Sequence, residues 1–224
     1  PAQDITLDAT LTANTYYAIF YLDEAKTNEY TRVPTVYGQE IQFPVNPEVA
    51  GMTFDGWDNT STVMGAGDME FVAILTAIEY NISFVNEDGT SYDDGSYDNI
   101  YYYNDSVDAP DVEPTKTGYT FDGWYLDGAK VTFPVVIDSA TQRDYEFTAQ
   151  FTINQYTLTF ADTGDSVIDP ITQDYGTAIT APEDPTRVGY TFAGWDTEIP
   201  ATMPAGDMTI TATWTAANFK LIYK

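Results

Sequence analysis

The sequence contains neither cysteine nor histidine, and only 8 of its 224 residues are lysine or arginine. Without cysteine and histidine, the chain cannot carry a thiol nucleophile, a Ser-His-Asp triad, an imidazole proton shuttle or a zinc site of the usual kind. The lack of cysteine is compatible with both reducing and oxidising compartments, so it does not identify one.

The shortage of basic residues excludes a further class of partners. Aspartate and glutamate number 35, which gives a net charge of −27, and they are scattered along the chain. Nucleic acids and anionic lipid surfaces bind patches of lysine and arginine, and none is present. No run approaches the ~18 consecutive apolar residues of a membrane-spanning helix. We therefore expect no nucleic-acid partner and no membrane insertion in this segment.

Aromatic residues, by contrast, are abundant. They make up 15% of the chain, and hydrophobic residues as a whole make up 43%. A disordered acidic tail would carry far fewer, so the chain has enough apolar surface to form cores. Its length suits one large β domain or two to three small ones.

One heptapeptide occurs three times, as GMTFDGW at 51–57, GYTFDGW at 118–124 and GYTFAGW at 189–195. A catalytic motif is normally needed once per active site, so the three copies indicate a repeated architecture. A second set of similar segments, starting at Leu11, Leu75, Phe151 and Trp214, marks the junctions between modules. The predicted segments are the last strand of a preceding repeat at 1–13, three modules at 14–78, 79–153 and 154–216, and the first strand of a following repeat at 217–224.

The modules are predicted to be β structure. In "YNISF" (80–84) and "YTLTF" (156–160), apolar residues alternate with polar ones, which is the period of a half-buried strand. Segments that contain proline precede each heptapeptide, and they are predicted to be extended edge or loop segments. The fold class predicted from the residues is mainly β, with α+β as an option.

The heptapeptide itself is predicted to be structural. A β-bulge at its second glycine would turn the tryptophan towards the core, and its first glycine would permit a turn before the strand. The alternative is that the tryptophans are exposed platforms for stacking sugars. The residues predicted to carry the structural motif are Gly51, Phe54, Gly56, Trp57, Gly118, Tyr119, Phe121, Gly123, Trp124, Gly189, Tyr190, Phe192, Gly194 and Trp195.

The third module carries a combination of motifs that is specific for one family. They are Y-x-x-x-F at 156–160, Tyr175-Gly176, the run P-x-x-P-T-R-x-G-Y-T-F-x-G-W at 182–195, and A-x-W at 212–214. The module resembles the internalin-type B-repeat, also called the Listeria–Bacteroides repeat. The other modules depart from the pattern at Met52, where tyrosine is usual, and at Tyr103-Asn104, which replaces Tyr-Gly. The usual Gly-Gly of the first hairpin is also missing.

The resemblance implies a small β-grasp-like (ubiquitin/SUMO-like) module, repeated in tandem as an elongated rod. It also implies a bacterial extracellular protein, secreted or wall-attached at the cell surface, in which the repeats act as a stalk or adhesion segment and not as an enzyme. The expected partners are the neighbouring repeats of the same protein.

An acidic segment of the second module is a weak candidate for binding calcium, which prefers 6–8 oxygen ligands. It does not match the usual calcium loop, and a hairpin rich in turn-forming residues explains it as well. No cofactor is otherwise expected. The candidate ligands are Asp88, Asp93, Asp94 and Asp98.

Two alternatives to a simple stalk remain at the level of sequence. Tyr101, Tyr102 and Tyr103 form either a face that binds a host or cell-surface glycan or protein, or a strand covered on both faces. Residues 1–21 match residues 204–224 at 9 of 21 positions, so terminal strands could pair between copies in a self-assembling filament. An enzyme that uses two carboxylates is not expected, because no carboxylate pair stands out among the 35 acids.

Overall fold

The computed structural model describes residue 3 and residues 8–140 and 143–218. By their contacts, the described residues form two compact units. The first comprises residues within 1–82, 98–107 and 134–145, and the second residues within 83–97, 108–133 and 146–224. The strands fall into three successive groups along the chain, which are called the first, middle and third repeats.

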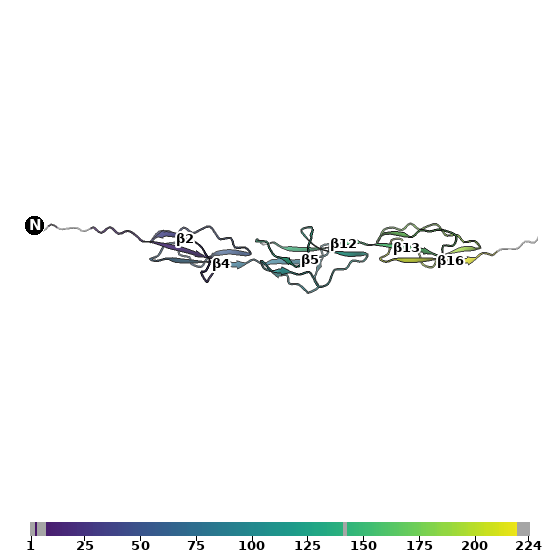
Figure 1. Ribbon diagram of the computed structural model, residues 1–224, viewed down its shortest axis with the longest axis horizontal. Helices are drawn as coiled ribbons and strands as arrows, with labels where there is room; N and C mark the ends of the chain where they lie inside the picture. Colours follow the sequence, from purple (N-terminus) through teal and green to yellow (C-terminus); the bar gives the residue numbers. More distant parts are fainter. Residues whose placement is uncertain (1–2, 4–7, 141–142, 219–224) are drawn as a thin grey trace, which may run out of the picture. The chain divides into compact units, whose positions relative to one another are not determined.

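The first repeat is a four-stranded mixed sheet. Its strands are β1 (Thr15–Tyr21), β2 (Glu29–Val36), β3 (Met52–Trp57) and β4 (Met69–Ala77), in the spatial order β2-β1-β4-β3. Figure 1 labels β2 and β4 of this repeat. The central pair, β1 and β4, is parallel, and each edge strand is antiparallel to its neighbour. The first and last strands of the repeat therefore lie side by side and point the same way.

The third repeat has the same sheet. Its strands are β13 (Gln155–Ala161), β14 (Ile171–Asp174), β15 (Tyr190–Trp195) and β16 (Met208–Ala216), in the order β14-β13-β16-β15. Its central strands β13 and β16 are again parallel. The register is also the same, because Phe20 pairs with Phe71 in the first repeat and Phe160 with Ile210 in the third.

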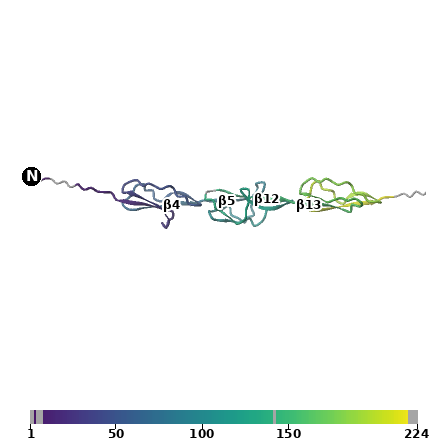
Figure 2. The same ribbon diagram turned by 45° about the horizontal axis from the view of Figure 1, so that its top comes forward.

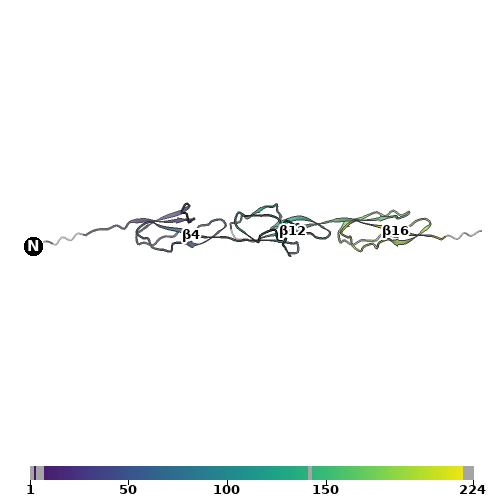
Figure 3. The same cartoon turned by 90° about the horizontal axis from the view of Figure 1, so that it is seen from below.

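The middle repeat has a larger sheet with shorter accessory strands. The sheet order is β10-β9-β12-β5-β6, with β7 also paired to β5, and β8 pairs with β11 apart from it. Figure 2 labels β5 and β12 of this repeat. The last strands of the three repeats, β4, β12 and β16, can be followed in Figure 3. The strands of the middle repeat are β5 (Tyr80–Val85), β6 (Ser91–Tyr92), β7 (Ile100–Tyr101), β8 (Ser106–Val107), β9 (Tyr119–Leu126), β10 (Ala129–Lys130), β11 (Val135–Val136) and β12 (Tyr145–Ile153).

Alternation along the strands determines which side chains are buried. In β1, Ala18 and Phe20 are buried and the residues between and beside them are not. In β12, Tyr145, Phe147 and Ala149 are buried in the same way. One face of each sheet therefore carries the core, as the period of two predicts.

A second, smaller pair of extended segments covers the core in each repeat. In the first repeat, the N–H of Ile41 donates to Thr62 and that of Met64 to Gln39, at 2.8 and 2.9 Å. Residues 176–179 and 201–203 pair in the same manner in the third repeat, and β8 with β11 in the middle one. These segments bring in three fully buried side chains, those of Met64, Ile137 and Met203.

The tryptophans of the heptapeptides are part of the aromatic cores. The ring of Trp57 lies edge-on to Phe20 at 4.8 Å, Trp124 is edge-on to Phe84 at 4.8 Å, and Trp195 lies 5.2 Å from Phe160. Trp124 is only 4% exposed, and the other two are half-buried against their clusters. None of the three is an open platform for stacking a sugar.

A β-bulge occurs at the second glycine of each heptapeptide. In the first repeat the register shifts between Phe54 and Gly56, which leaves Asp55 as the extra residue. The shift recurs at Gly123 and Gly194. The three glycines have φ of +134°, +143° and +114°, which residues with a side chain rarely adopt. The predicted bulge is therefore present, and its geometry explains the need for glycine.

The described residues contain no helix. The prediction of a mainly β protein is therefore confirmed for the described residues, and the α+β option is not needed. The proline-bearing segments before the heptapeptides, at 43–51, 109–118 and 181–189, carry no strand, because proline cannot donate to a ladder. Nothing in the described part of the chain forms a helix able to cross a lipid bilayer.

Candidate functional site

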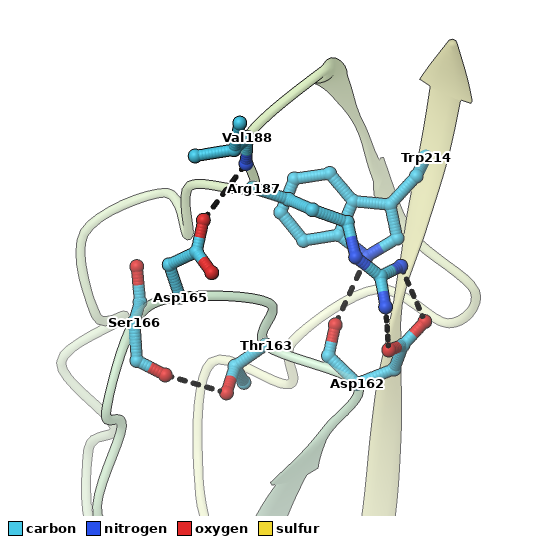
Figure 4. Close-up of polar contacts among 7 residues, drawn as sticks. All are labelled: Asp162, Thr163, Asp165, Ser166, Arg187, Val188 and Trp214. Carbon is cyan, nitrogen blue, oxygen red and sulfur yellow. Dashed lines mark hydrogen bonds and ion pairs between the residues drawn. The ribbon is translucent and has the colours of Figure 1, made fainter.

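The candidate site of the third repeat is a cation placed against two aromatic rings, of which Figure 4 draws that of Trp214. The guanidinium of Arg187 forms two hydrogen bonds with the carboxylate of Asp162, at 2.9 and 3.3 Å. Its central carbon lies 5.3 Å from the ring centroid of Trp214 and 5.4 Å from that of Tyr190. These four residues are named the cation–aromatic cluster of the third repeat.

The turn after β13 has the backbone shape that places Asp162. Asp162 and Gly164 have φ of +53° and +62°. A Cβ at Gly164 would lie 2.5 Å from the carbonyl oxygen of Thr186 and 2.8 Å from the Cβ of Arg187. Glycine is therefore required there, because the segment that carries Arg187 passes directly over the turn.

Hydrogen bonds fix the segment that carries Arg187, and the last strand, to the turn. The N–H of Asp165 donates to the carbonyl of Thr186 at 2.7 Å, and the N–H of Val188 donates to the carboxylate of Asp165 at 2.7 Å. The indole N–H of Trp214, on β16, donates to the carbonyl of Asp162 at 2.9 Å. The cluster thus joins the first hairpin, the segment that contains proline and the last strand (Figure 4).

The middle repeat contains a counterpart built from different side chains. The ammonium of Lys116 lies 2.6 Å from the carboxylate of Glu87, 4.1 Å from the ring centroid of Tyr119 and 5.6 Å from that of Phe151. The hydrogen bond with Glu87 raises the pKa of Lys116. Lys116 therefore keeps the positive charge that attracts the negative ring faces.

Each cluster borders a depression in the surface. The one beside Lys116 has a volume of about 360 Å³ and is also lined by Glu87 and Phe151. The one beside Arg187 has a volume of about 400 Å³ and is also lined by Tyr190 and Trp214. In size both fall near the lower end of small-molecule sites.

The first repeat lacks such a cluster at the equivalent positions. Val49 stands two residues before the first glycine of the motif, where the other repeats have Lys116 and Arg187. Leu75 stands on the last strand, where they have Phe151 and Trp214. The cluster is therefore not a requirement of the sheet, which is the same in the first and third repeats.

The resolved pKa shifts of the described carboxyl groups all have the same direction. Every carboxyl group whose pKa is shifted has it lowered, through hydrogen bonds or ion pairs with nearby groups. A general acid that works near neutral pH would need a raised pKa instead. The groups with a lowered pKa are Asp23, Glu29, Asp88, Asp94 and Asp122.

The predicted calcium candidates do not come together. Among the described residues, no group of three or more acidic side chains is placed to hold a metal ion. The carboxylates serve turns instead, because a side-chain oxygen that accepts from the backbone two residues on closes an Asx turn. The bonds are Thr90 N–H to Asp88 at 3.0 Å, Gly95 N–H to Asp93 at 2.8 Å and Ser96 N–H to Asp94 at 3.0 Å. Asp98, the fourth candidate, completes no such group.

The three predicted tyrosines do not present one common face. Tyr102 is exposed, at 43%, whereas Tyr101 and Tyr103 are half-buried. Tyr101 pairs with Tyr80 in the sheet, and the hydroxyl of Tyr102 donates to Glu79 at 3.3 Å. The proposal that these residues bind a glycan or protein therefore concerns a single exposed ring.

Sequence reasoning missed the cation–aromatic clusters. Their members lie 25 and 27 residues apart in the third repeat, at 162, 187 and 214, and no local pattern connects them. One signal was present, since a basic residue occurs two positions before the glycine in two of three copies, at Lys116 and Arg187.

Comparison with known proteins identifies related chains. The curated relatives include two proteins of Evansella cellulosilytica whose names call them membrane proteins, one of them Gly-rich. They are 27% and 26% identical over 98% and 95% of this chain. Internalin H of Listeria monocytogenes is 39% identical over 50% of the chain. The chain spans only 34%, 26% and 22% of the length of these three relatives.

A family model describes the repeated unit itself. The model of the Listeria-Bacteroides repeat domain matches residues 16–73, 80–154 and 156–219, in three tandem copies. These matches cover most of the chain, and they include all three heptapeptides. The chain therefore belongs to the Listeria-Bacteroides repeat family.

Proposed function

We propose that this chain is a non-enzymatic spacer of a bacterial extracellular surface protein, in which its repeats act as a stalk in adhesion. The observation that carries the proposal is the tandem match of three family repeats over most of the chain. Support comes from relatives that are named as membrane proteins or as an internalin, and of whose length the match covers about a third or less.

The sheet of the first and third repeats supports a β-grasp-like module. Its order β2-β1-β4-β3 places the first and last strands in parallel at the centre with a hairpin strand at the edge. The segment that contains proline, at 43–51, takes the chain from one edge strand to the other, where a larger β-grasp domain would use a helix. The proposed module is thus a reduced form of that fold.

The charge distribution is consistent with the role of a spacer. A net charge of −27 keeps copies apart and discourages non-specific association. The carboxylates with a lowered pKa remain ionised at neutral pH, and those of Asp23, Asp88 and Asp94 accept backbone hydrogen bonds that close turns and loops. In a spacer, the acidic residues would keep the protein soluble and hold its loops, and they would take part in no catalytic step.

Small-angle X-ray scattering of the purified chain tests the proposal. A single compact globule of this length would have a radius of gyration of about 17 Å. A spacer should give at least about twice that value and remain monomeric over a concentration series. A value near that of the globule would refute the stalk.

The same concentration series separates the two alternatives. End-to-end assembly would favour a filament, whose terminal strands were predicted at 1–13 and 217–224. Residues 8–13, 217 and 218 carry no strand, and the rest of those segments, apart from residue 3, lies outside the described residues. Saturable binding of a cell-surface glycan or protein that is lost in Tyr102→Ala would favour a binding module instead.

A further inference from the structure

The first glycine of the heptapeptide has nearly the same backbone in all three repeats but different surroundings. Gly51, Gly118 and Gly189 have φ of +71°, +79° and +81°. A Cβ at Gly51 would overlap the side chain of Tyr103, and one at Gly118 would overlap the ring of Tyr175. At Gly189, nothing lies within 4 Å of the same position.

The two tyrosines that cover these glycines are equivalent, and each belongs to the following repeat. Each precedes a residue with positive φ, namely Asn104 at +69° or Gly176 at +76°. The N–H of that residue donates to a backbone carbonyl in the buried segment, at 2.9 Å in both repeats. Asparagine tolerates this backbone, which explains why it can replace glycine in the middle repeat. The tyrosine is therefore presented in the same way in both repeats.

Tyr37 is the equivalent tyrosine of the first repeat, and it is exposed. It precedes Gly38, whose φ is +77° and whose N–H donates to Met64 at 3.0 Å. Its exposed fraction is 53%, whereas Tyr103 and Tyr175 are half-buried. Tyr37 thus shows the tyrosine side of the contact without a glycine against it. Gly189 shows the glycine side without a tyrosine over it.

One residue between repeats bonds to both sides. The N–H of Asn154 donates to the carbonyl of Gly118, and its own carbonyl accepts from the N–H of Tyr175, both at 2.9 Å. Its side-chain oxygen accepts from the hydroxyl of Thr120 at 2.7 Å. The ring of Tyr119 also lies edge-on to that of Tyr175, with centroids 6.2 Å apart. The tyrosine, the glycine and the junction residue are thus linked by backbone and side chain.

The counterparts of Asn154 show each half of this arrangement. Asn14 accepts from the N–H of Tyr37 at 2.8 Å, and the N–H of Ala217 donates to Gly189 at 2.9 Å. At the junction of the middle and third repeats a single residue, Asn154, makes both bonds, and at Gly51 the bond to the glycine carbonyl is made by the N–H of Ile78 at 2.9 Å. If the contact formed between two separate chains, Asn14 of one chain and Ala217 of the other would have to occupy the position that Asn154 fills alone. The contact therefore suits consecutive repeats of a continuous chain.

We propose that this contact is an inter-repeat joint, in which the tyrosine of one repeat seats on the glycine turn of the repeat before it and fixes their relative orientation. The partner that Tyr37 and the open face of Gly189 fit is another repeat of this family in the same polypeptide. The joint goes beyond the proposed function, because a spacer with freely swinging repeats would still be a spacer.

Gly118→Ala and Gly189→Ala form a matched pair that tests the joint. Both impose a Cβ on the same strained backbone, but only Gly118→Ala displaces a tyrosine. The measurement is hydrogen exchange of the backbone amide that donates to the carbonyl of each glycine. This is the amide of Asn154 for Gly118 and the amide of Ala217 for Gly189. If the joint exists, Gly118→Ala should accelerate exchange of the Asn154 amide at least about tenfold more than Gly189→Ala accelerates exchange of the Ala217 amide. Equal acceleration would overturn the proposal.

Tyr175→Ala and Tyr37→Ala provide a second test that does not depend on glycine strain. Residual dipolar couplings of the full chain report the relative orientation of the middle and third repeats. Tyr175→Ala should give these repeats different alignment tensors, whereas Tyr37→Ala should leave their common alignment unchanged. An unchanged alignment in Tyr175→Ala would overturn the joint.

An extended chain tests the open surface. When a copy of residues 155–217 follows Ala217, Gly189→Ala should accelerate the Ala217 amide as strongly as Gly118→Ala accelerates the Asn154 amide. No added effect of Gly189→Ala in the extended chain would show that this surface does not accept a repeat.

Discussion

Arg187 is the residue on which the loops of the third repeat converge. It bonds to Asp162 through two nitrogens and lies over the ring of Trp214. Lys116 has the same position in the middle repeat with a single ion pair. Both are partly exposed, so each is expected to contribute modestly to stability.

Arg187→Val, which introduces the residue type that the first repeat has, should lower the free energy of unfolding by about 1 kcal/mol. An exposed ion pair contributes about 0.2–1 kcal/mol and a cation–π contact about 0.5–1 kcal/mol. Urea denaturation measures the change. Arg32→Val is the comparison, since Arg32 pairs with Glu29 on the same strand and its guanidinium carbon lies 5.8 Å from the ring centroid of Tyr17, and it should cost less than Arg187→Val. Equal costs would contradict a special role for Arg187.

Asp94 should make the loop around it sensitive to acid. Its carboxylate accepts from the hydroxyl and N–H of Ser96 and from the N–H of Val112, and these bonds hold its pKa below the ordinary value of 3.8. A lowered folded pKa gives stabilisation that is present above pH 3.8 and is lost as the pH falls through the lower folded value.

NMR titration of the Val112 amide from pH 6 to pH 2 follows this loss. The amide should shift only below about pH 4, where the carboxyl group begins to be protonated. Asp94→Asn, which cannot titrate, should remove the transition. A transition that persists in Asp94→Asn would assign it to another group.

Residue roles were predictable where the reason was local. The bulge glycines follow from the alternation of neighbouring side chains, and all three have the predicted register shift. The partners of Arg187 were not predictable, because the turn and the strand that carry them meet only in the folded sheet. The acidic segment showed calcium-like composition, but its oxygens serve turns.

At the scale of elements, the segments that cover each sheet are as important as the strands. Residues 201–203 form only an isolated bridge with residues 177–179, yet they place Met203 in the core with 1% exposure. Such a short pairing has no period of two to detect, so the sequence predicted the sheet strands but not this second layer.

Met203→Ala should therefore destabilise the protein by about 2–5 kcal/mol, because it removes a buried side chain that joins the second layer to the sheet. Val167→Ala in the same repeat is a suitable control, since Val167 is 92% exposed, and it should change stability by less than about 0.5 kcal/mol. Thermal and urea unfolding give both values. A small effect of Met203→Ala would mean that the second layer is not part of the stable core.

At the scale of the whole molecule, charge is the property most different from that of an ordinary domain. Five ion pairs within the described residues are all partly exposed. They offset little of the repulsion that a net charge of −27 produces. Salt should therefore stabilise this protein.

Raising sodium chloride from about 0.01 M to about 0.15 M shortens the Debye length from about 30 Å to about 8 Å. The melting temperature should rise by a few °C, roughly the effect of 1 kcal/mol. Differential scanning calorimetry measures it. A fall in the melting temperature would mean that screening of ion pairs outweighs the screening of repulsion.

The tandem organisation was predictable from the three heptapeptides alone, and the family match agrees with it. The two contact units were not predictable, because their boundary cuts β5 and β12. Part of the middle repeat, including Tyr103, belongs to the first unit, in which Tyr103 contacts Gly51. A repeat in sequence is thus not the same as a unit of contact.

The parallel central pair has a mechanical consequence. Because β1 opens the first repeat and β4 closes it, tension applied to the two ends of the repeat pulls these neighbouring strands in opposite directions along their length. Their ladder, from Ala18–Met69 to Tyr21–Val72, then bears the load in shear, with its hydrogen bonds strained together rather than unzipped one at a time. The third repeat, with β13 and β16 in the same register, would resist extension in the same way.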